Sequence, residues 1–373
     1  MNMEFTARKS ELLKELDLAQ GVAEKKTTIP ILSNILLEAT DSELRLSATD
    51  LELALRCGCP ARVKKAGAST VPGKRLLEVV RSLPDAEIKF KVLENHFIQV
   101  TCERSSFKLA GMAKDNFPAL PEAPRELAVI PAGVLTLMIQ RTGFAISSEE
   151  SRYTLNGALL LLKPDRILMV ATDGHRLAQV EREVQVEGLD NELRVLIPKR
   201  AMGELYRLLS QGGDQAPIRF SKDESHLFFS AGHRILISRV LTGQFPNYEA
   251  VIPRENHRVM EAKKEQIAEA IRRVALLADE RSRAIRLQLA KGRLEIFSSS
   301  GEYGEAHEVL DVSYDSEDMQ IGFNYQYLLD FLGAVGESEN VRMELKDEQS
   351  AGQLRPAEDD ACRYRYVVMP MRV

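Results

Sequence analysis

The residues best suited to acid–base chemistry lie in one short stretch, Asp173-Gly174-His175. A carboxylate close to an imidazole is a pair that general acid–base catalysis uses. However, the chain has only six histidines, which are scattered, and no plausible nucleophile lies near this stretch. No phosphate-binding loop of the GxxxxGK[ST] type occurs, so we do not expect the chain to use ATP. An enzyme is the main competing class, but we expect no catalytic residue and no intrinsic activity.

The four cysteines are the other residues that could carry chemistry. Cys57, Cys59, Cys102 and Cys362 form no CxxC pair, which argues against a zinc site and against a disulfide framework. One residue separates Cys57 from Cys59, and this spacing suits two strand residues that face the same way better than two metal ligands. We therefore expect no metal and no cofactor.

Basic side chains that could bind an anion occur at the start of a predicted helix, residues 197–209. Lys199 and Arg200 begin it, and Pro198 suits the first turn, where a missing N–H costs nothing. Its apolar residues recur at helical spacing and would face a core, namely Met202, Leu205, Leu208 and Leu209.

This helix pattern occurs three times at a constant interval. Lys74 precedes Lys199 by 125 residues, and Arg200 precedes Tyr325 by the same distance. We predict three domains of about 124 residues, within the usual range of domain sizes, with boundaries at 1–124, 125–253 and 254–373. Each contains helices and hairpin-like strand clusters, which predicts an α+β class with antiparallel sheets. Repeats that stack by a constant rotation form a curved array.

The composition sets broad limits on function. The formal net charge of −5 argues against a protein that binds nucleic acid over its whole surface, although a local basic face remains compatible with it. No apolar run approaches the roughly 20 residues that a membrane span needs, and the N-terminus lacks the layout of a signal peptide. We expect a cytoplasmic protein with no membrane partner.

Three stretches carry a family resemblance that covers the whole chain. They are Ala171–Leu177 (ATDGHRL), Phe245–Tyr248 (FPNY) and Tyr366–Arg372 (YVVMPMR). Together with the threefold repeat, they resemble the bacterial DNA polymerase III beta subunit family, the sliding clamps. The resemblance implies the DNA clamp fold and a head-to-tail homodimer, with helices inside a six-domain ring and sheets outside. It also implies that the ring encircles double-stranded DNA as a polymerase processivity factor.

The resemblance also assigns the basic residues. Those that would reach the hole and meet DNA phosphates are Lys14, Lys74, Lys199 and Arg200, and matching family positions add Lys26, Arg152 and Tyr153. Phosphate contacts carry no sequence information, which suits a ring that slides. The alternative for each lysine is a solvated surface charge.

The resemblance further implies a groove between the second and third domains that binds a short hydrophobic peptide. The matching positions are Leu155, Thr172, Gly174, His175, Arg176, Leu177, Pro246, Val251, Asn324, Tyr327, Val367, Val368, Met369, Pro370, Met371 and Arg372. The implied partners are the DNA polymerase III alpha subunit, the clamp loader, and other polymerases and mismatch-repair proteins with clamp-binding motifs. Two family positions differ: Ser282 stands where a Phe can line the groove, and Ala250 stands where the family can have an Arg. For the apolar residues Val367, Val368 and Met369, the alternative to a peptide groove is a final core strand followed by a loose chain end.

The resemblance also implies that the ring closes through edge strands and a small apolar cluster. Phe107 and Leu109 would face Leu276 and Leu277 of the other chain, and Arg104 would face Glu305 and Glu308. Packing within one domain is the alternative for the four apolar residues.

A second rival class is a scaffold built from the same repeats that does not bind DNA. Charge reversal at Lys74, Lys199 and Arg200 would distinguish it from a clamp.

Overall fold

The computed structural model describes residues 3–23, 28–149, 151–211, 217–358 and 362–372. The chain divides into two compact units. Unit one comprises Met1–Thr136 and Arg200–Val240, and unit two comprises Leu137–Lys199 and Leu241–Val373. The described strands form four sheets, all antiparallel, and each sheet lies within one unit.

Unit one contains two of these sheets. The order of the first is β5 (Arg62–Lys65), β1 (Glu4–Arg8), β7 (Glu87–Val92), β8 (Ile98–Cys102) and β9 (Ser105–Leu109). The order of the second is β10 (Ala128–Pro131), β15 (Pro217–Lys222), β16 (His226–Ala231), β17 (Arg234–Arg239), β4 (Leu53–Pro60), β3 (Glu43–Thr49), β2 (Asn34–Thr40) and β6 (Gly67–Pro72).

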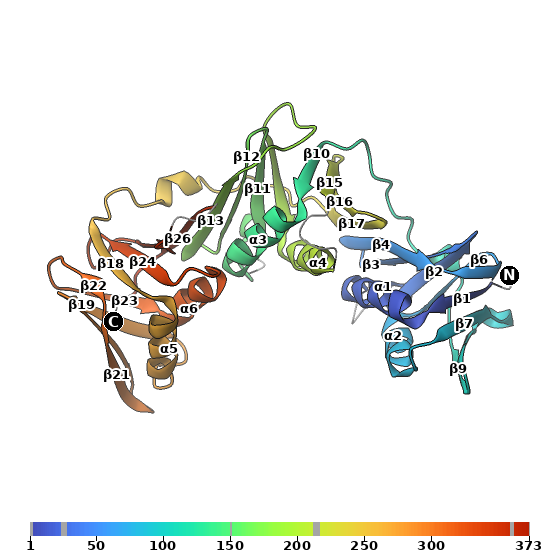
Figure 1. Cartoon of the computed structure of the whole chain (residues 1–373), viewed down its shortest axis with the longest axis horizontal. Helices are drawn as coiled ribbons and strands as arrows, with labels where there is room; N and C mark the ends of the chain where they lie inside the picture. Colours follow the sequence, from blue (N-terminus) through green and yellow to red (C-terminus); the bar gives the residue numbers. More distant parts are fainter. Residues whose placement is uncertain (1–2, 24–27, 150, 212–216, 359–361, 373) are drawn as a thin grey trace. The chain divides into compact units, whose positions relative to one another are not determined.

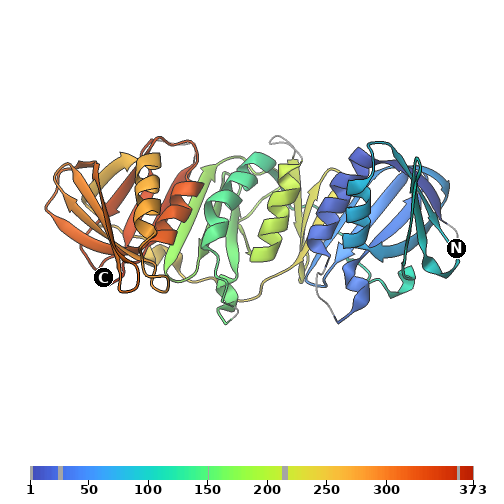
Figure 2. The same ribbon diagram turned by 90° about the horizontal axis from the view of Figure 1, so that it is seen from below.

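The helices of unit one cover these sheets with their apolar faces. Helices α1 (Lys9–Val22) and α2 (Gly73–Ser82) lie side by side (Figures 1 and 2). Leu12 and Leu16 of α1 are fully buried, and burial of each side chain contributes about 1.5–3 kcal/mol. Helix α4 (Lys199–Ser210) buries the predicted face of Met202, Leu205, Leu208 and Leu209.

Unit two contains the other two sheets. The larger has the order β14 (Leu193–Pro198), β11 (Gly157–Lys163), β12 (Arg166–Thr172), β13 (Arg176–Glu183), β26 (Arg363–Val368), β25 (Gly352–Pro356), β24 (Asn340–Leu345), β18 (Arg258–Lys263) and β22 (Ser313–Tyr314). The smaller has the order β21 (Gly304–Asp311), β20 (Arg293–Ser300), β19 (Ala284–Ala290) and β23 (Met319–Asn324).

Helices α5 (Lys264–Ala275) and α6 (Tyr325–Ala334) pack together in unit two. Helix α3 (Ala132–Thr142) contains residues of both units, and so does α4, whose first residue Lys199 belongs to unit two. Short 3-10 turns complete the described elements: η1 (Pro30–Ser33), η2 (Glu94–His96), η3 (Lys114–Asn116), η4 (Gly143–Ala145), η5 (Tyr153–Leu155) and η6 (Tyr248–Val251). Among the described residues, no helix is long and apolar enough to span a membrane.

Strands of different predicted segments share sheets. In unit one β4 pairs with β17, with Leu55 opposite Leu236. In unit two β13 pairs with β26, with Leu177 opposite Val367. The last strand of the chain is therefore hydrogen-bonded to the strand that follows the Thr172–Arg176 turn, and this pairing builds the site described below.

The sequence predicts helices that open at Val71, Ile130 and Ile197, and each predicted start is two residues too early because a strand ends there. Pro72, Pro131 and Pro198 are the last residues of β6, β10 and β14, and the helices begin one residue later. Each of these strands is at the edge of its sheet, where proline's missing N–H breaks no ladder bond. The spacing of apolar residues also predicts a first helix over residues 7–22. This helix begins at Lys9, because residues Glu4–Arg8 form β1.

Candidate functional site

The turn between β12 and β13 is held by its own side chains. Thr172 Oγ1 donates to the carbonyl of Arg176 (2.6 Å) and accepts from the N–H of Gly174 (3.1 Å). Asp173 Oδ1 accepts from the N–H groups of His175 (2.9 Å) and Arg176 (3.1 Å). Gly174 has φ +90°, a conformation that favours glycine. The Asp173 carboxylate therefore shapes a turn, as Asp and Ser/Thr side chains do at such positions.

A cavity of about 160 Å³ lies beside this turn, entirely within unit two. The predicted groove residues that line it are Leu155, Thr172, Gly174, His175, Arg176, Leu177, Pro246, Val251, Val367 and Met369. Asn247 and Tyr248 also line it and were not predicted individually, although both belong to the FPNY stretch that carried the resemblance. The floor is an apolar cluster that includes Leu177 and Val367, with Phe245 and Tyr248 packed against it.

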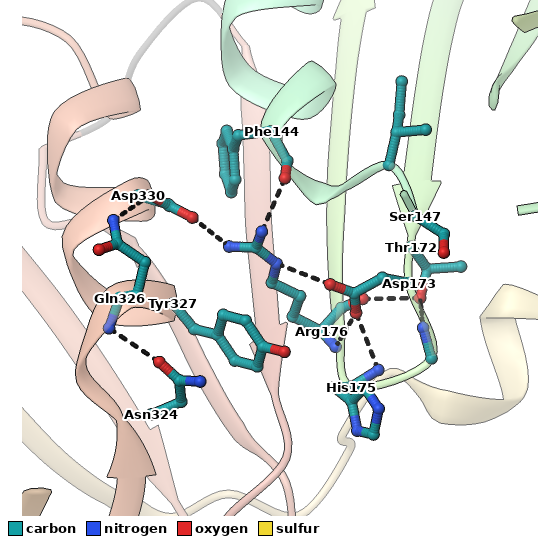
Figure 3. A network of polar contacts seen from close by, with 12 residues as sticks. Phe144, Ser147, Thr172, Asp173, His175, Arg176, Asn324, Gln326, Tyr327 and Asp330 are labelled. Atoms are coloured by element: carbon teal, nitrogen blue, oxygen red, sulfur yellow. Dashed lines mark hydrogen bonds and ion pairs between the residues drawn. The ribbon is translucent and has the colours of Figure 1, made fainter. Parts of the chain in front are cut away.

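The Arg176 side chain joins three elements at the edge of this cavity (Figure 3). Its Nε donates to Asp173 Oδ2 (3.0 Å), its Nη2 donates to the carbonyl of Phe144 (2.7 Å), and its Nη1 forms an ion pair with Asp330 of α6. Burial works against its charge, but Tyr366 and Asp330 outweigh burial and raise the pKa of Arg176 above its usual value. The guanidinium is therefore a fixed cation.

The start of α6 carries two of the predicted groove residues, Asn324 and Tyr327. The Asn324 side chain accepts from the N–H of Gln326 (2.9 Å) and caps the helix. The Tyr327 ring lies 4.3 Å from the Arg176 guanidinium carbon, a cation–π distance. Burial raises the pKa of Tyr327, and the Asp173 carboxylate acts in the same direction, so the phenol stays neutral. Asn324 and Tyr327 are not among the described residues that line the 160 Å³ cavity.

The other predicted groove residues lie elsewhere around β26. Val368 is fully buried in that strand. Pro370, Met371 and Arg372 line a separate cavity of about 410 Å³ with residues of β23, and the N–H of Met371 donates to the carbonyl of Gly322 (2.8 Å). Neither Ser282 nor Ala250 is among the described residues that line either cavity.

The predicted DNA-contacting residues of unit one fall into two kinds. Lys14 of α1 and Lys74 of α2 are exposed and have no ion pair or hydrogen bond with any other described residue. Arg200 is exposed but already engaged, since it forms an ion pair with Asp50 and donates to the carbonyl of Val22 (3.1 Å). Lys26 lies outside the described residues.

In unit two, Lys199 and Arg152 also have partners within the chain. Lys199 Nζ donates to Ser148 Oγ (2.6 Å). Arg152 forms an ion pair with Glu149 (2.8 Å) and donates from Nη1 to the carbonyl of Asp173 (2.7 Å), so it contacts the turn beside the cavity. Tyr153 is 55% exposed.

The predicted dimer residues lie at or near two free sheet edges, β9 in unit one and β21 in unit two. Leu276, just after α5, is 78% exposed. Phe107, Leu109 and Leu277 are half-buried, and Arg104 and Glu305 are exposed. Glu308 accepts from Arg273 Nε (2.9 Å), a partner on its own chain that we did not predict.

Comparisons with known proteins cover the chain from end to end. Models of the DNA polymerase III beta subunit match in three parts, the N-terminal domain at residues 3–121, the central domain at 129–247 and the C-terminal domain at 249–372. The beta sliding clamps of Pseudomonas aeruginosa and Escherichia coli (strain K12) are 37% and 35% identical, each with 100% of both chains covered.

A crystal structure of the DNA polymerase III subunit beta from Pseudomonas aeruginosa has a TM-score of 0.91 at 37% identity, again with 100% of both chains covered. These matches and the antiparallel sheets confirm the predicted α+β class and the three-domain DNA clamp fold. The chain therefore belongs to the DNA polymerase III beta subunit family, the sliding clamps, and is a processivity factor that works with DNA and polymerase rather than an enzyme.

Proposed function

We propose that two copies of this chain join head to tail into a ring around duplex DNA, and that the groove beside the Thr172–Arg176 turn tethers partner proteins to that ring. The three domains are 1–124, 125–253 and 254–373 of each chain. Helices line the hole and sheets form the outside. The ring acts on DNA in the cytoplasm.

The DNA-facing surface in this proposal is the helix side of each domain. Lys14 and Lys74 support it best, because each projects a charge that no described residue neutralises. Lys26, Lys199, Arg152, Tyr153 and Arg200 complete the set. Flexible lysines bind phosphates without reading bases, so the ring slides and its retention comes from enclosure.

Ring closure joins strand β9 of one copy to β21 of the other. Both are unpaired edges, and pairing them satisfies N–H and C=O groups that otherwise face solvent. Leu276, which is 78% exposed, packs with Leu277 against Phe107 and Leu109 of the other copy. Arg104 then meets Glu305 and Glu308, and Glu308 shares its charge with Arg273 of its own chain.

The observation that carries the tethering role is the apolar cavity beside the turn. Val251 and Met369 at its rim are 54% and 47% exposed, although both are apolar. A contiguous exposed apolar surface of this kind marks a site that a ligand covers, and methionine adapts to apolar ligands of different shape. We assign it to short hydrophobic peptides of the DNA polymerase III alpha subunit, the clamp loader, other polymerases and mismatch-repair proteins. Asn324, Tyr327 and residues 370–372 extend this groove.

Retention on circular DNA tests the ring. The purified protein is loaded onto nicked plasmid by its cognate loader and ATP, isolated by gel filtration, and the plasmid is then cut. Retention on the circle and release on cutting is the expected result. Equal retention on both forms would indicate ordinary DNA affinity, and no retention on either form, with an active loader and a dimeric protein, would contradict enclosure.

Peptide binding is tested separately. A fluorescein-labelled peptide that carries the clamp-binding segment of the cognate alpha subunit is titrated with the protein in the absence of DNA. Saturable binding that Val367→Asp abolishes is expected, because Val367 is in the cavity floor and is 3% exposed. Binding that survives this change, in a variant that keeps its thermal unfolding temperature, would place the peptide elsewhere.

A further inference from the structure

A chain of polar contacts runs from the start of α6 to the turn beside the cavity (Figure 3). The Gln326 side chain donates from Nε2 to Asp330 Oδ1 (2.8 Å), and Asp330 Oδ2 forms the ion pair with Arg176. Arg176 in turn donates to Asp173, which fixes the turn. The two sides of the proposed groove, separated by about 150 residues of sequence, are therefore joined through one carboxylate on α6.

We propose that Asp330 is a positioning residue for peptide binding, which rests on the proposed function of the groove. Through Arg176 it holds the Asn324 and Tyr327 side of the groove at a fixed distance from the Thr172–Arg176 turn. Asp330 is not among the described residues that line the cavity, so it acts on a ligand through Arg176.

The other partners of Arg176 explain why Asp330 controls the position of α6. Phe144 and Asp173 both lie on the β12–β13 side, and their oxygen atoms would still hold the guanidinium if Asp330 were neutral. The Arg176 side chain is only 10% exposed and its planar fork has a fixed geometry. Loss of the carboxylate would therefore leave Arg176 with the turn and remove its ion pair with α6, so that the Tyr327 ring alone would remain as its described contact with that helix.

The fold of α6 itself does not depend on this ion pair. Tyr366 Oη donates to the carbonyl of Tyr327 (2.9 Å), and the Phe331 and Tyr366 rings stack with centroids 5.3 Å apart. These contacts attach α6 to β26. Removal of Asp330 should therefore widen the range of groove geometries without unfolding the helix.

The length of a peptide determines whether removal of the Asp330 carboxylate weakens its binding. A peptide that fills only the apolar cavity contacts Leu177, Val367 and their neighbours, all of which stay in place. A peptide that also reaches Asn324 and Tyr327 needs both sides at the correct distance. If only a fraction of the protein molecules has that geometry, the apparent affinity for the longer peptide is reduced by that fraction.

The test compares two ligands on Asp330→Ala and Asp330→Asn proteins. The long ligand is the labelled alpha-subunit peptide, followed by fluorescence anisotropy, and the short one is acetyl-Leu-Phe amide, followed by nuclear magnetic resonance titration. We expect about ten-fold weaker binding of the long ligand, the range for one charge-assisted hydrogen bond, and an unchanged Kd for the short one. Asp315→Ala is the matched control, because it removes an exposed carboxylate paired with Lys291 and should change neither Kd.

A double-mutant cycle shows whether Asp330 acts through Arg176. Added to Arg176→Ala, the Asp330→Ala change should weaken the long ligand no further. Equal losses for both ligands, no loss for the long ligand, or additive losses in the cycle would each overturn the positioning role. If the unchanged protein binds neither ligand, the proposed function of the groove fails instead.

Discussion

Asp50 and Asp173 make the same contacts in two turns that lie 123 residues apart. Asp50 Oδ1 accepts from the N–H groups two and three residues ahead, at 3.0 and 2.7 Å, and Asp173 Oδ1 does so at 2.9 and 3.1 Å. Thr49 and Thr172 each close their turn with a hydroxyl that both donates and accepts. The domain repeat therefore extends to individual hydrogen bonds.

The two carboxylates differ in their cationic partner. Asp50 forms its ion pair with Arg200 of α4, whereas Asp173 binds Arg176 of its own turn. Leu53 takes the place of Arg176 in the first turn. Of these two turns, the second therefore has an arginine that reaches across to α6, and the first does not.

The first prediction concerns Gly174, the third residue of its turn, which corresponds to Leu51 in the first turn. Leu51 and Gly174 both have positive φ, +80° and +90°, so the backbone alone does not exclude a side chain. At Gly174, however, a Cβ atom would lie 2.5 Å from Arg152 Nη1. Gly174→Ala should therefore displace Arg152 and weaken binding of the alpha-subunit peptide, in addition to a backbone cost of about 1–2 kcal/mol measured by urea denaturation.

Two further variants separate these effects. Gly174→Ala combined with Arg152→Ala should bind the peptide better than Gly174→Ala alone, because the clash is gone. Gly203→Ala is the control, since a Cβ there meets nothing within 4 Å, and in a helix it should stabilise the protein by about 0.5–1 kcal/mol. Unchanged peptide affinity in Gly174→Ala would contradict the steric argument.

A second prediction concerns the buried ion pair between Glu15 of α1 and Arg234 of β17. Arg234 Nη2 donates to Glu15 Oε1 (2.6 Å), the two side chains are 5% and 10% exposed, and His233 lies 3.5 Å from the same carboxylate. Arg234→Ala should lower the free energy of unfolding by about 3–5 kcal/mol, because Glu15 is left buried with no arginine partner.

The matched control for this pair is an exposed one. Arg219→Ala removes an ion pair with Glu126 in which the arginine is 69% exposed, and it should cost less than about 1 kcal/mol. Replacement of both buried partners, Glu15→Leu with Arg234→Met, should recover most of the loss in urea denaturation. A small effect of Arg234→Ala would show that His233 suffices as a partner.

Much of the fold follows from periodicity, because helix faces and alternating strands are local patterns. The junctions were predicted less well. Pro72, Pro131 and Pro198 suit the first turn of a helix and the end of an edge strand equally well, and only the neighbouring strands decide between them. Strand β1 was missed for a similar reason, since its five residues give too short a pattern.

The candidate site was predictable only as far as its motifs reach. Apart from Leu155 and Val251, the cavity residues lie in the three short stretches that carry the family resemblance. The ion pair of Arg176 with Asp330 joins residues 154 apart, and no local spacing indicates it. Likewise, Arg200 appears in the sequence as an available cation, and its partner Asp50 is found only in the folded chain.

A third prediction concerns pH. Cys59 is 4% exposed, and burial, reinforced by Glu15, Glu11 and Glu43, raises the pKa of its thiol from 9.0 to about 12. The folded protein thus keeps a proton that the unfolded chain releases above pH 9. The associated stability is complete below pH 9 and is lost as pH rises toward 12. Relative to Cys59→Ala, the wild-type protein should lose free energy of unfolding only within this window, as followed by urea denaturation at each pH. If the difference in free energy of unfolding between the wild-type and Cys59→Ala proteins stayed constant from pH 8 to 11, the raised pKa of Cys59 would be contradicted.

The last prediction tests the proposed ring interface at Leu276. Its side chain is 78% exposed on the single chain, so Leu276→Asp should change the stability of that chain by less than about 0.5 kcal/mol. In the proposed dimer the same carboxylate would be buried among apolar side chains with no partner. We expect the dimer Kd to rise at least about 100-fold, or roughly 3 kcal/mol, in sedimentation equilibrium. Val259→Asp is the control, because Val259 is an exposed apolar residue of β18 (38% exposed) outside the proposed interface, and it should leave the dimer intact. A Leu276→Asp protein that dimerises as tightly as the wild type would exclude this cluster from the interface, even if β9 and β21 still pair.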